Sequence, residues 1–262
     1  MAAPMVPEPL LDELMQIALR VAQGAARTLD QYSAAHLKQV GTKSSPTDMV
    51  SEADRASEEY IFHELRSSRP EDSVEGEEGA SYQGSSGISW VADPLDGTTN
   101  FLYSIPAYSV SLAALSNGEP VVGVVTNPVT AETWWAGRGR GAWVNGVRCQ
   151  VAEGRSQLST ALVATGFGYQ AEQRARQASI LPRLLPTVRD IRRFGSAALD
   201  LCWVACGRYD AYYEAELNAW DWAAGRLICE EAGGEVTLLP GNILLATTPS
   251  LSNPLTNLLA GR

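Results

Sequence analysis

The most informative stretch of this chain is Asp93-Pro94-Leu95-Asp96-Gly97-Thr98-Thr99-Asn100-Phe101. Pro94 fixes its own backbone φ and restricts the residue before it, so Asp93 is held extended. Gly97 permits a turn and a close approach of the backbone. Thr98 and Thr99 then supply hydroxyls and open backbone N–H groups. Hard oxygen atoms and N–H groups within one turn suit a divalent cation and a phosphate group.

Further acidic residues lie elsewhere in the chain. Glu77 and Glu78 fall in a polar loop, and Asp221 falls at the expected start of a helix. Each cluster has a purely structural alternative: a solvated loop for Glu77-Glu78, helix capping for Asp221 and ordinary turn chemistry for Asp93-Pro94. If the clusters converge, their carboxylates raise one another's pKa unless cations neutralise them. Two Mg²⁺ ions about 3.5–4 Å apart, held by such oxygens, form a clamp for phosphoryl transfer.

The whole chain has the composition of a globular protein with a sizeable core. Its 262 residues are 45% hydrophobic and 19% charged, and the net charge is −10 with a pI of about 4.8. This acidity makes nucleic acid and anionic membrane poor partners. The first ten residues lack the basic and apolar segments of a signal peptide, and no apolar run reaches transmembrane length. We therefore expect a cytoplasmic protein.

Hydrophobic periodicity predicts two helices, then a polar loop, then a run of strands. The helices span about Leu10 to Leu29 and Ser51 to Arg66, the loop spans 69–87, and the strands are Ile88–Ala92, Ala107–Leu115, Val121–Thr126, Trp134-Trp135 and Ala142–Val144. Asn117-Gly118 and Asn145-Gly146 are strong hairpin signals. The middle third of the chain is therefore expected to form an antiparallel meander.

The pattern becomes mixed after about residue 155. The expected elements are a strand at Ala161–Thr165, a helix over Ala171–Leu185 that Pro182 kinks or ends, a helix capped by Ser196 and stopped by Gly207, a strand at Tyr209–Tyr213, a helix from Asp221 to Gly233-Gly234, strands at Val236–Leu239 and Ile243–Ala246, and a last turn of helix. These elements predict an α+β fold with two sheets and helices layered between them.

Several ordered motifs resemble those of the inositol monophosphatase family. Residues 93–101 resemble its first signature, and Trp220–Gly225 with Glu230–Gly234 resemble its second. Gly76-Glu77-Glu78 resembles the acidic loop of the family, and Lys43–Asp48 its flexible N-terminal segment. Gly195-Ser196-Ala197 and Tyr212-Tyr213-Glu214 also fall in order, so that the resemblance covers roughly residues 10 to 248.

The resemblance implies a layered αβαβα sandwich similar to fructose-1,6-bisphosphatase. An antiparallel sheet would belong to the N-terminal half and a mixed sheet to the C-terminal half. The boundary is expected near residue 155: residues 1–155 would carry most metal ligands, and residues 156–262 would carry Asp221 and the substrate pocket. The two halves would form one compact unit.

The resemblance also implies a magnesium site with two to three ions. Glu77, Asp93, Asp96 and the carbonyl of Leu95 would hold the first ion. Asp93, Asp96 and Asp221 would hold the second. Glu77 would also reach a weaker third ion through water, which gives it a catalytic role, and Glu78 is a further candidate beside it.

The remaining family roles fall on residues that handle water and substrate. Thr98, oriented by Asp54, would position the attacking water and help to deprotonate it. The N–H groups of Gly97 and Thr98 would bind phosphate, with Thr99 beside them. Ala197 and Glu214 would contact the hydroxyl-bearing part of the substrate, and Lys43 would close over the metals. Simpler alternatives are helix capping for Asp54, a solvated loop for Lys43 and an exposed strand end for Glu214.

The activity implied by the resemblance is Mg²⁺-dependent hydrolysis of an inositol monophosphate by a metal-activated water. It also implies lithium sensitivity and a homodimer. Alternatives within the superfamily are an L-histidinol-phosphate phosphatase and phosphatases of fructose 1,6-bisphosphate or 3′-phosphoadenosine compounds. An alternative of another class is a non-catalytic, metal-binding regulator. The motifs specify how a phosphate ester would be hydrolysed and do not say which alcohol carries the phosphate.

Overall fold

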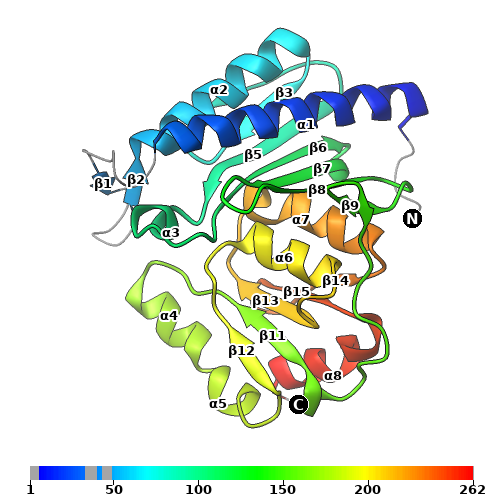
Figure 1. Ribbon diagram of the computed structural model, residues 1–262. Helices are drawn as coiled ribbons and strands as arrows, with labels where there is room; N and C mark the ends of the chain where they lie inside the picture. The colour runs from blue at the N-terminus through cyan, green and yellow to red at the C-terminus, as the bar shows by residue number, and fades with distance from the viewer. Residues whose placement is uncertain (1–5, 33–39, 43–48, 262) are drawn as a thin grey trace.

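The structure, a computed structural model, describes residues 6–32, 40–42 and 49–261. Its helices and sheets form alternating layers, with helices outermost on both sides and a pair of helices between the two sheets (Figure 1). The expected αβαβα sandwich is therefore confirmed. A small two-stranded sheet, β1 (Val40–Thr42) and β2 (Met49–Ser51), lies beside the layers.

The first outer layer consists of α1 (Glu8–Gln31) and α2 (Glu52–Ser68), which match the two helices predicted from the sequence. Leu14, Val21 and Leu29 of α1 are fully buried. This helix packs against the neighbouring α2 and against the first sheet. Burial of such an apolar stripe stabilises an amphipathic helix more than its intrinsic propensity does.

The first sheet has the strand order β10-β9-β8-β7-β6-β5-β3-β4. Its strands are β3 (Ser73–Gly76), β4 (Ser81–Tyr82), β5 (Ile88–Asp96), β6 (Ser109–Ser116), β7 (Glu119–Asn127), β8 (Glu132–Gly137), β9 (Ala142–Val144) and β10 (Val147–Arg148). The expected meander is present from β5 to β10.

Two expectations about this sheet are wrong. The segment 69–87 is not only a loop, because it contains β3 and β4. The sheet is also not purely antiparallel, because β3 runs parallel to β5. Val74 explains why so polar a segment joins the sheet: it is 3% exposed and belongs to the same core as Trp90.

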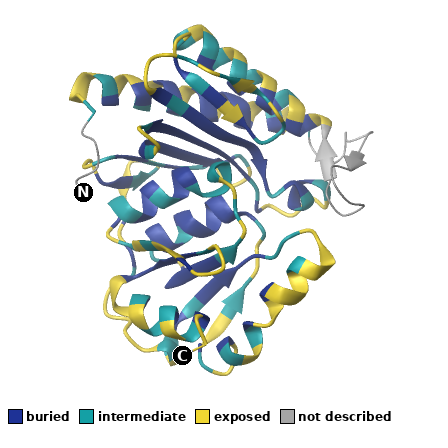
Figure 2. Cartoon of the chain, turned by 180° about the vertical axis from the view of Figure 1, so that it is seen from behind, coloured by how far each residue is buried: buried dark blue, intermediate teal, exposed yellow. Residues whose placement is uncertain are grey.

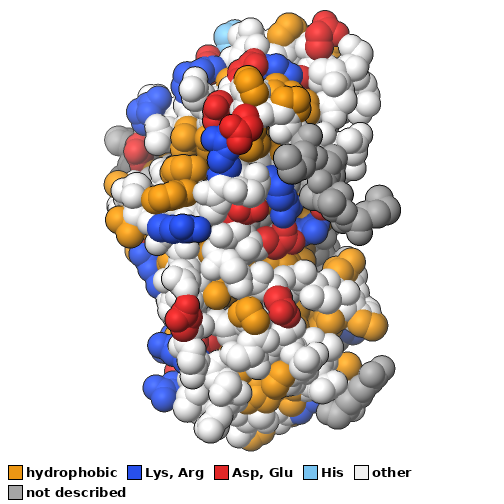
Figure 3. Space-filling view, turned by 90° about the vertical axis from the view of Figure 1, so that its right-hand side faces the viewer, with side chains coloured by type: hydrophobic (Ala, Val, Ile, Leu, Met, Phe, Trp, Pro, Cys, Tyr) orange, Lys and Arg blue, Asp and Glu red, His pale blue; other side chains and the backbone are white. Residues whose placement is uncertain are grey.

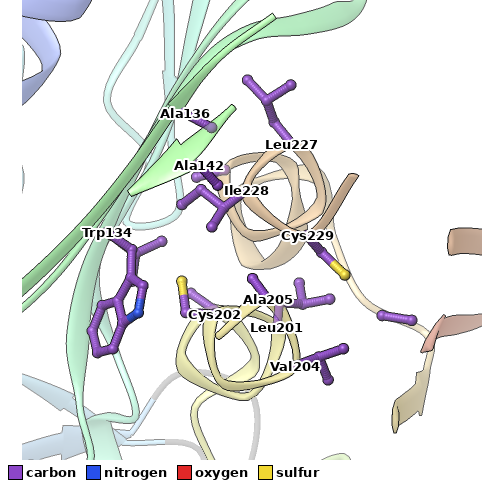
Figure 4. Packing of buried hydrophobic residues seen from close by; sticks show 14 of the residues in the cluster. Trp134, Ala136, Ala142, Leu201, Cys202, Val204, Ala205, Leu227, Ile228 and Cys229 are labelled. Atoms are coloured by element: carbon purple, nitrogen blue, oxygen red, sulfur yellow. The ribbon is translucent and has the colours of Figure 1, made fainter. Parts of the chain in front are cut away.

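The middle layer consists of α6 (Ala197–Ala205) and α7 (Ala219–Glu231). Their apolar side chains interlock with each other and with Trp134 of the first sheet (Figure 4). As predicted, Ser196 caps α6, because its Oγ accepts the N–H of Leu199. In contrast, α7 begins before Asp221: Asn218 is its cap, and Asp221 is the third residue of its first turn.

The second sheet has the order β12-β11-β13-β15-β14 and is mixed, as expected. Its strands are β11 (Leu162–Thr165), β12 (Asp190–Arg192), β13 (Ala211–Ala215), β14 (Glu235–Leu239) and β15 (Ile243–Thr247), after a 3₁₀ turn at Leu158–Thr160.

Outside the second sheet lie the helices α4 (Ala171–Ala178), α5 (Leu181–Leu184) and α8 (Pro249–Leu259). The long helix expected over 171–185 is divided before Pro182, which lies in the first turn of α5, and α8 is longer than one turn.

The central strands of the two sheets and most of the paired helices are buried, whereas the edge strands β10 and β14 and one face of the outer helices are exposed to solvent (Figure 2). On the face that Figure 3 shows, acidic and basic side chains are interspersed. The negative net charge is therefore not gathered into a single acidic patch on that face. Among the described helices, none combines the length and the apolar character needed to cross a bilayer.

Candidate active site

The acidic turn of the first signature is built at the end of β5. Pairing with β6 joins Asp93 to Ser111 and Asp96 to Ser109, with an irregularity between the two pairs. Such a bulge changes the direction in which side chains point. The Oδ1 of Asp93 accepts the N–H of Leu95 over 3.0 Å, and both residues are buried. The turn therefore fixes Asp93 at the strand end.

Gly97 joins this turn to α3 (Thr98–Leu102), a short helix that the sequence did not predict. Its φ is +96°, and a Cβ at this position would lie 2.9 Å from the carbonyl oxygen of Ala107. Both the backbone conformation and the space therefore require glycine. The first N–H groups of any α-helix lack intrahelical acceptors, so those at the start of α3 are available to an anion.

The hydroxyl of Thr98 lies between two acceptors. Its Oγ1 is 3.1 Å from the carbonyl oxygen of Leu95 and 3.4 Å from Oδ2 of Asp54. A hydroxyl has one proton, so it donates to one of these oxygens at a time. Asp54 is fully buried on α2. The structure thus brings together Thr98 and Asp54, which are 44 residues apart in the sequence.

Three of the predicted metal ligands come from separate elements and meet in space. Carboxylate oxygens of Glu77, Asp93 and Asp221 all lie within 4.8 Å of one another. Glu77 follows β3, Asp93 belongs to β5, and Asp221 belongs to the first turn of α7. Such an all-oxygen set fits a hard cation such as Mg²⁺.

Asp96 is oriented differently, toward the start of α6. Its Oδ2 accepts the hydroxyl of Ser196 over 2.6 Å and the N–H of Ala198 over 2.8 Å, and its Oδ1 accepts the N–H of Ala197 over 3.3 Å. Negative charge is favourable at a helix N-terminus. The backbone of Ala197, which was expected to contact substrate, therefore also holds Asp96.

The pKa values of the acidic residues reflect their crowding in a buried site. Burial, followed by the charges of Glu77, Asp96 and Asp221, raises the pKa of Asp93 well above its usual range. Burial raises the pKa of Asp221 to about 8, with a smaller contribution from Asp96. The pKa of Asp96 rises to about 6, also chiefly through burial, although its hydrogen bonds from Ser196 and Ala198 oppose the rise. Cations bound among these oxygens would remove the repulsion.

Other predicted site residues line a cavity of about 320 Å³ beside this cluster. The cavity lies at the ends of β5, β11 and β13 and at the starts of α6 and α7, and its wall includes Glu77, Asp96, Gly97, Ala197, Glu214 and Asp221. Burial raises the pKa of Glu214 to about 7. Its Oε2 accepts the hydroxyl of Tyr212 over 2.7 Å.

The remaining candidate site residues from the sequence are Glu78, Thr99 and Lys43. The N–H of Glu78 donates to Glu58, and within the described part of the chain the cavity wall includes Glu77 but not Glu78. The side chain of Thr99 lies beside the hydroxyl of Tyr169. Lys43 lies outside the described residues.

Tyr169 and Arg193 are among the residues of the cavity wall that the sequence did not name individually. Tyr169 reaches Thr99, and burial together with the charge of Glu77 raises its pKa to about 12. Arg193 lies close to Glu214, and its Nη2 donates to the carbonyl oxygen of Phe167 over 3.3 Å. Both precede a recognised element and lie in loops, and for Arg193 no local pattern distinguishes it from a solvated residue.

The layered fold and the cluster of Glu77, Asp93 and Asp221 are those of the class of metal-dependent phosphatases that the sequence motifs predicted. The model of the inositol monophosphatase family matches residues 10–261. The chain belongs to this family.

Individual relatives cover most of the chain. Inositol-1-monophosphatase of Mycobacterium leprae is 44% identical over 231 residues, which are 82% of this chain and 79% of the relative. Nus factor SuhB of Pasteurella multocida is 38% identical over 94% of this chain and 96% of its own length. The crystal structure of extragenic suppressor protein suhB from Bartonella henselae is 39% identical, covers 94% of this chain and 98% of its own, and has a TM-score of 0.87.

Proposed function

We propose that this protein is a Mg²⁺-dependent phosphomonoesterase that hydrolyses an inositol monophosphate to inositol and inorganic phosphate. The observation that carries the proposal is the convergence of Glu77, Asp93 and Asp221 within 4.8 Å, beside a cavity of about 320 Å³. Asp96 and the carbonyl of Leu95 complete the proposed ligand set. Mg²⁺, when bound, would neutralise these oxygens, lower the pKa of water and stabilise the charge of the phosphate.

The residues of the turn and of α2 would handle the attacking water. Thr98 lies within reach of the buried Asp54 carboxylate. Its hydroxyl can therefore accept a hydrogen bond from water while it donates to Asp54. The N–H groups of Gly97, Thr98 and Thr99, at the start of α3, would hold the phosphate oxygens. Direct attack by water needs no protein nucleophile, so no phospho-enzyme would form.

The opposite wall of the cavity would hold the alcohol. The hydroxyl of Tyr212 donates a hydrogen bond to Oε2 of Glu214. Oε1 of Glu214 would accept a hydrogen bond from an inositol hydroxyl. Arg193 adds donor groups at the same wall. The Mycobacterium leprae relative is named for the inositol substrate.

We also propose three properties that the family resemblance implies, namely two to three Mg²⁺ ions, inhibition by lithium and a homodimer. The cytoplasmic location expected from the sequence is proposed with them. One surface suits a second copy of the chain. Tyr103, Ile105 and Phe194 are 69%, 45% and 40% exposed, and Asn100 joins their segments by donating to the carbonyl of Phe194. Burial of these large apolar side chains would favour association.

The experiment that tests the proposed function is a phosphate-release assay over a panel of phosphomonoesters. The panel contains inositol 1-phosphate, L-histidinol phosphate, fructose 1,6-bisphosphate and 3′-phosphoadenosine 5′-phosphate, each with and without Mg²⁺. We expect Mg²⁺-dependent release, fastest from inositol 1-phosphate. A clear preference for L-histidinol phosphate would replace the substrate, and no release from any ester would contradict the enzymatic function.

A further inference from the structure

One face of α2 reaches several parts of the candidate active site. Asp54 lies next to the hydroxyl of Thr98, and the hydroxyl of Ser57 donates to the carbonyl oxygen of Pro94 over 2.9 Å. Glu58 follows one turn after Asp54, and residues at this spacing lie on the same side of a helix. The helix packs against β5 and β3, the two strands that lead to Asp93 and Glu77 (Figure 1).

Glu58 contacts the loop that carries Glu77. Its Oε1 accepts the N–H of Glu78 over 2.8 Å, and its Oε2 accepts the N–H of Ala80 over 3.2 Å. The side chain is almost completely buried, at 8% exposure. Both oxygens of one carboxylate therefore hold backbone donors of the same turn.

The loop is shaped to receive this carboxylate. A Cβ at Gly76 would lie 2.2 Å from Oε1 of Glu58, so a larger residue there would displace the glutamate. The N–H of Gly76 donates to the carbonyl oxygen of Ala80 over 2.8 Å and closes the turn. The N–H of Glu77 donates to the carbonyl oxygen of Ala92 on β5 over 3.2 Å. The backbone around Glu77 is thus fixed by β5 on one side and by Glu58 on the other.

An acid suits this position better than an amide. A carboxylate accepts both N–H groups, whereas a glutamine has one acceptor oxygen and would turn its NH₂ group toward one of the two donors. The loop would then shift, and the carboxylate of Glu77 would shift with it. A carboxylate oxygen of Glu77 lies within 4.8 Å of those of Asp93 and Asp221, so a shift of the loop would change the spacing of the cluster.

We propose that Glu58 is a positioning residue for the metal centre: by binding the N–H groups of Glu78 and Ala80, it holds Glu77 beside Asp93 and Asp221 and so sets the affinity for Mg²⁺. This inference rests on the proposed function, because it assumes that the carboxylate cluster binds Mg²⁺. Glu58 itself lies behind the loop and would contact neither the ion nor the substrate.

The test compares Glu58→Gln with Glu59→Gln. Glu59 is exposed on the same helix, so its variant makes the same change of charge without touching the loop. Mg²⁺ binding is measured by calorimetry, and Mn²⁺ binding by electron paramagnetic resonance, on protein freed of metal. Loss of a group that orients a metal ligand weakens metal binding by roughly 10–100-fold. We expect this loss for Glu58→Gln and wild-type affinity for Glu59→Gln.

A second variant and the melting temperature separate positioning from general stability. Glu58→Asp keeps the charge but is one methylene too short, so we expect it to lose affinity for Mg²⁺ as well. It also decides the question if Glu58→Gln does not fold. At saturating Mg²⁺, the KM for the phosphoester should stay at the wild-type value. A lower melting temperature with unchanged Mg²⁺ affinity in both variants would overturn the inference.

The same titrations show which claim fails. If the wild-type protein binds Mg²⁺ and both Glu58 variants bind it equally well, only the positioning role of Glu58 is contradicted. If the wild-type protein binds no Mg²⁺, the proposed function is contradicted, and the inference about Glu58 with it.

Discussion

The backbone N–H of Ala198 donates to Oδ2 of Asp96 over 2.8 Å, although the two residues are 102 positions apart in the sequence. This contact joins the end of β5, in the first sheet, to the first turn of α6, between the sheets. Asp96 thus acts as an anion at a helix N-terminus as well as a candidate metal ligand. The geometry of the candidate metal site therefore depends on the C-terminal part of the chain.

Removal of the Ser196 hydroxyl should weaken this junction. The hydroxyl donates to Asp96 and accepts the N–H of Leu199. We expect Ser196→Ala to lower the free energy of unfolding by about 1–2 kcal/mol, as the loss of a helix cap does. Chemical denaturation measures the change. Ser179→Ala, at an exposed hydroxyl, is the control, and an equal loss in both variants would contradict the special role of Ser196.

Mg²⁺ affinity should depend on pH. In the metal-free protein the pKa of Asp221 is raised to about 8 and that of Asp96 to about 6. Below these values protons occupy the carboxylates, and Mg²⁺ must displace them. Affinity should therefore fall as pH falls from about 8 to about 6, with release of protons on binding. Calorimetry in buffers of different ionisation enthalpy counts these protons, and release of none would contradict the raised pKa values.

Asp93→Asn should have opposite effects on stability and activity. The substitution removes a buried carboxyl whose pKa is raised by burial and by neighbouring acids. The metal-free variant should therefore melt a few degrees higher than the wild type, because each kcal/mol gained in the free energy of unfolding raises the melting temperature by about 2–4 °C. Phosphate release should fall by at least about 100-fold, since even loss of an outer partner costs 10–100-fold. A variant that still gains stability from Mg²⁺ to the wild-type extent would contradict the site.

Asp200 should limit stability at high pH. It is 1% exposed, and its carboxyl oxygens have no hydrogen-bond partner among the described residues. Burial, then the charges of Glu214 and Asp96, raise its pKa well above the ordinary 3.8. The folded state thus keeps a proton that the unfolded state releases, so stability is fully present below the ordinary pKa and is lost as pH rises through the folded pKa.

Asp200→Asn removes this ionisation. With Mg²⁺ present, the variant should melt a few degrees above the wild type at about pH 8, because each kcal/mol gained in the free energy of unfolding raises the melting temperature by about 2–4 °C. The difference in melting temperature should shrink toward about pH 4. Asp190→Asn is the control, because Arg192 lowers the pKa of this exposed carboxyl and no gain is expected at high pH. A constant difference at all pH values would contradict the account of Asp200.

Local patterns predicted much of the fold. Asn117-Gly118 identified the hairpin of β6 and β7, and Ser196 identified the start of α6. The parallel pairing of β3 with β5 was missed, because only Val74 in that polar segment is a strong core residue. Asp221 was expected to begin its helix, whereas it forms a capping box as the third residue after the cap Asn218.

The motifs identified the acidic residues of the candidate site, but not how they are held. The separation of Glu77, Asp93 and Asp221 in the sequence gives no distance, so their convergence could come only from the fold. Contacts such as Glu58 with Glu78, and Asp96 with α6, join distant segments and leave no local signal. The sequence therefore predicted the residues that carry the chemistry more completely than the contacts that hold those residues in place.

The most direct test is phosphate release from inositol 1-phosphate by protein stripped of metal with EDTA, before and after Mg²⁺ is added back. The account predicts no release by the stripped wild-type protein, restored release with Mg²⁺, and no restoration in Asp93→Asn. Full activity of the stripped protein, or restoration of Asp93→Asn to the wild-type rate, would contradict a metal centre built on Glu77, Asp93 and Asp221.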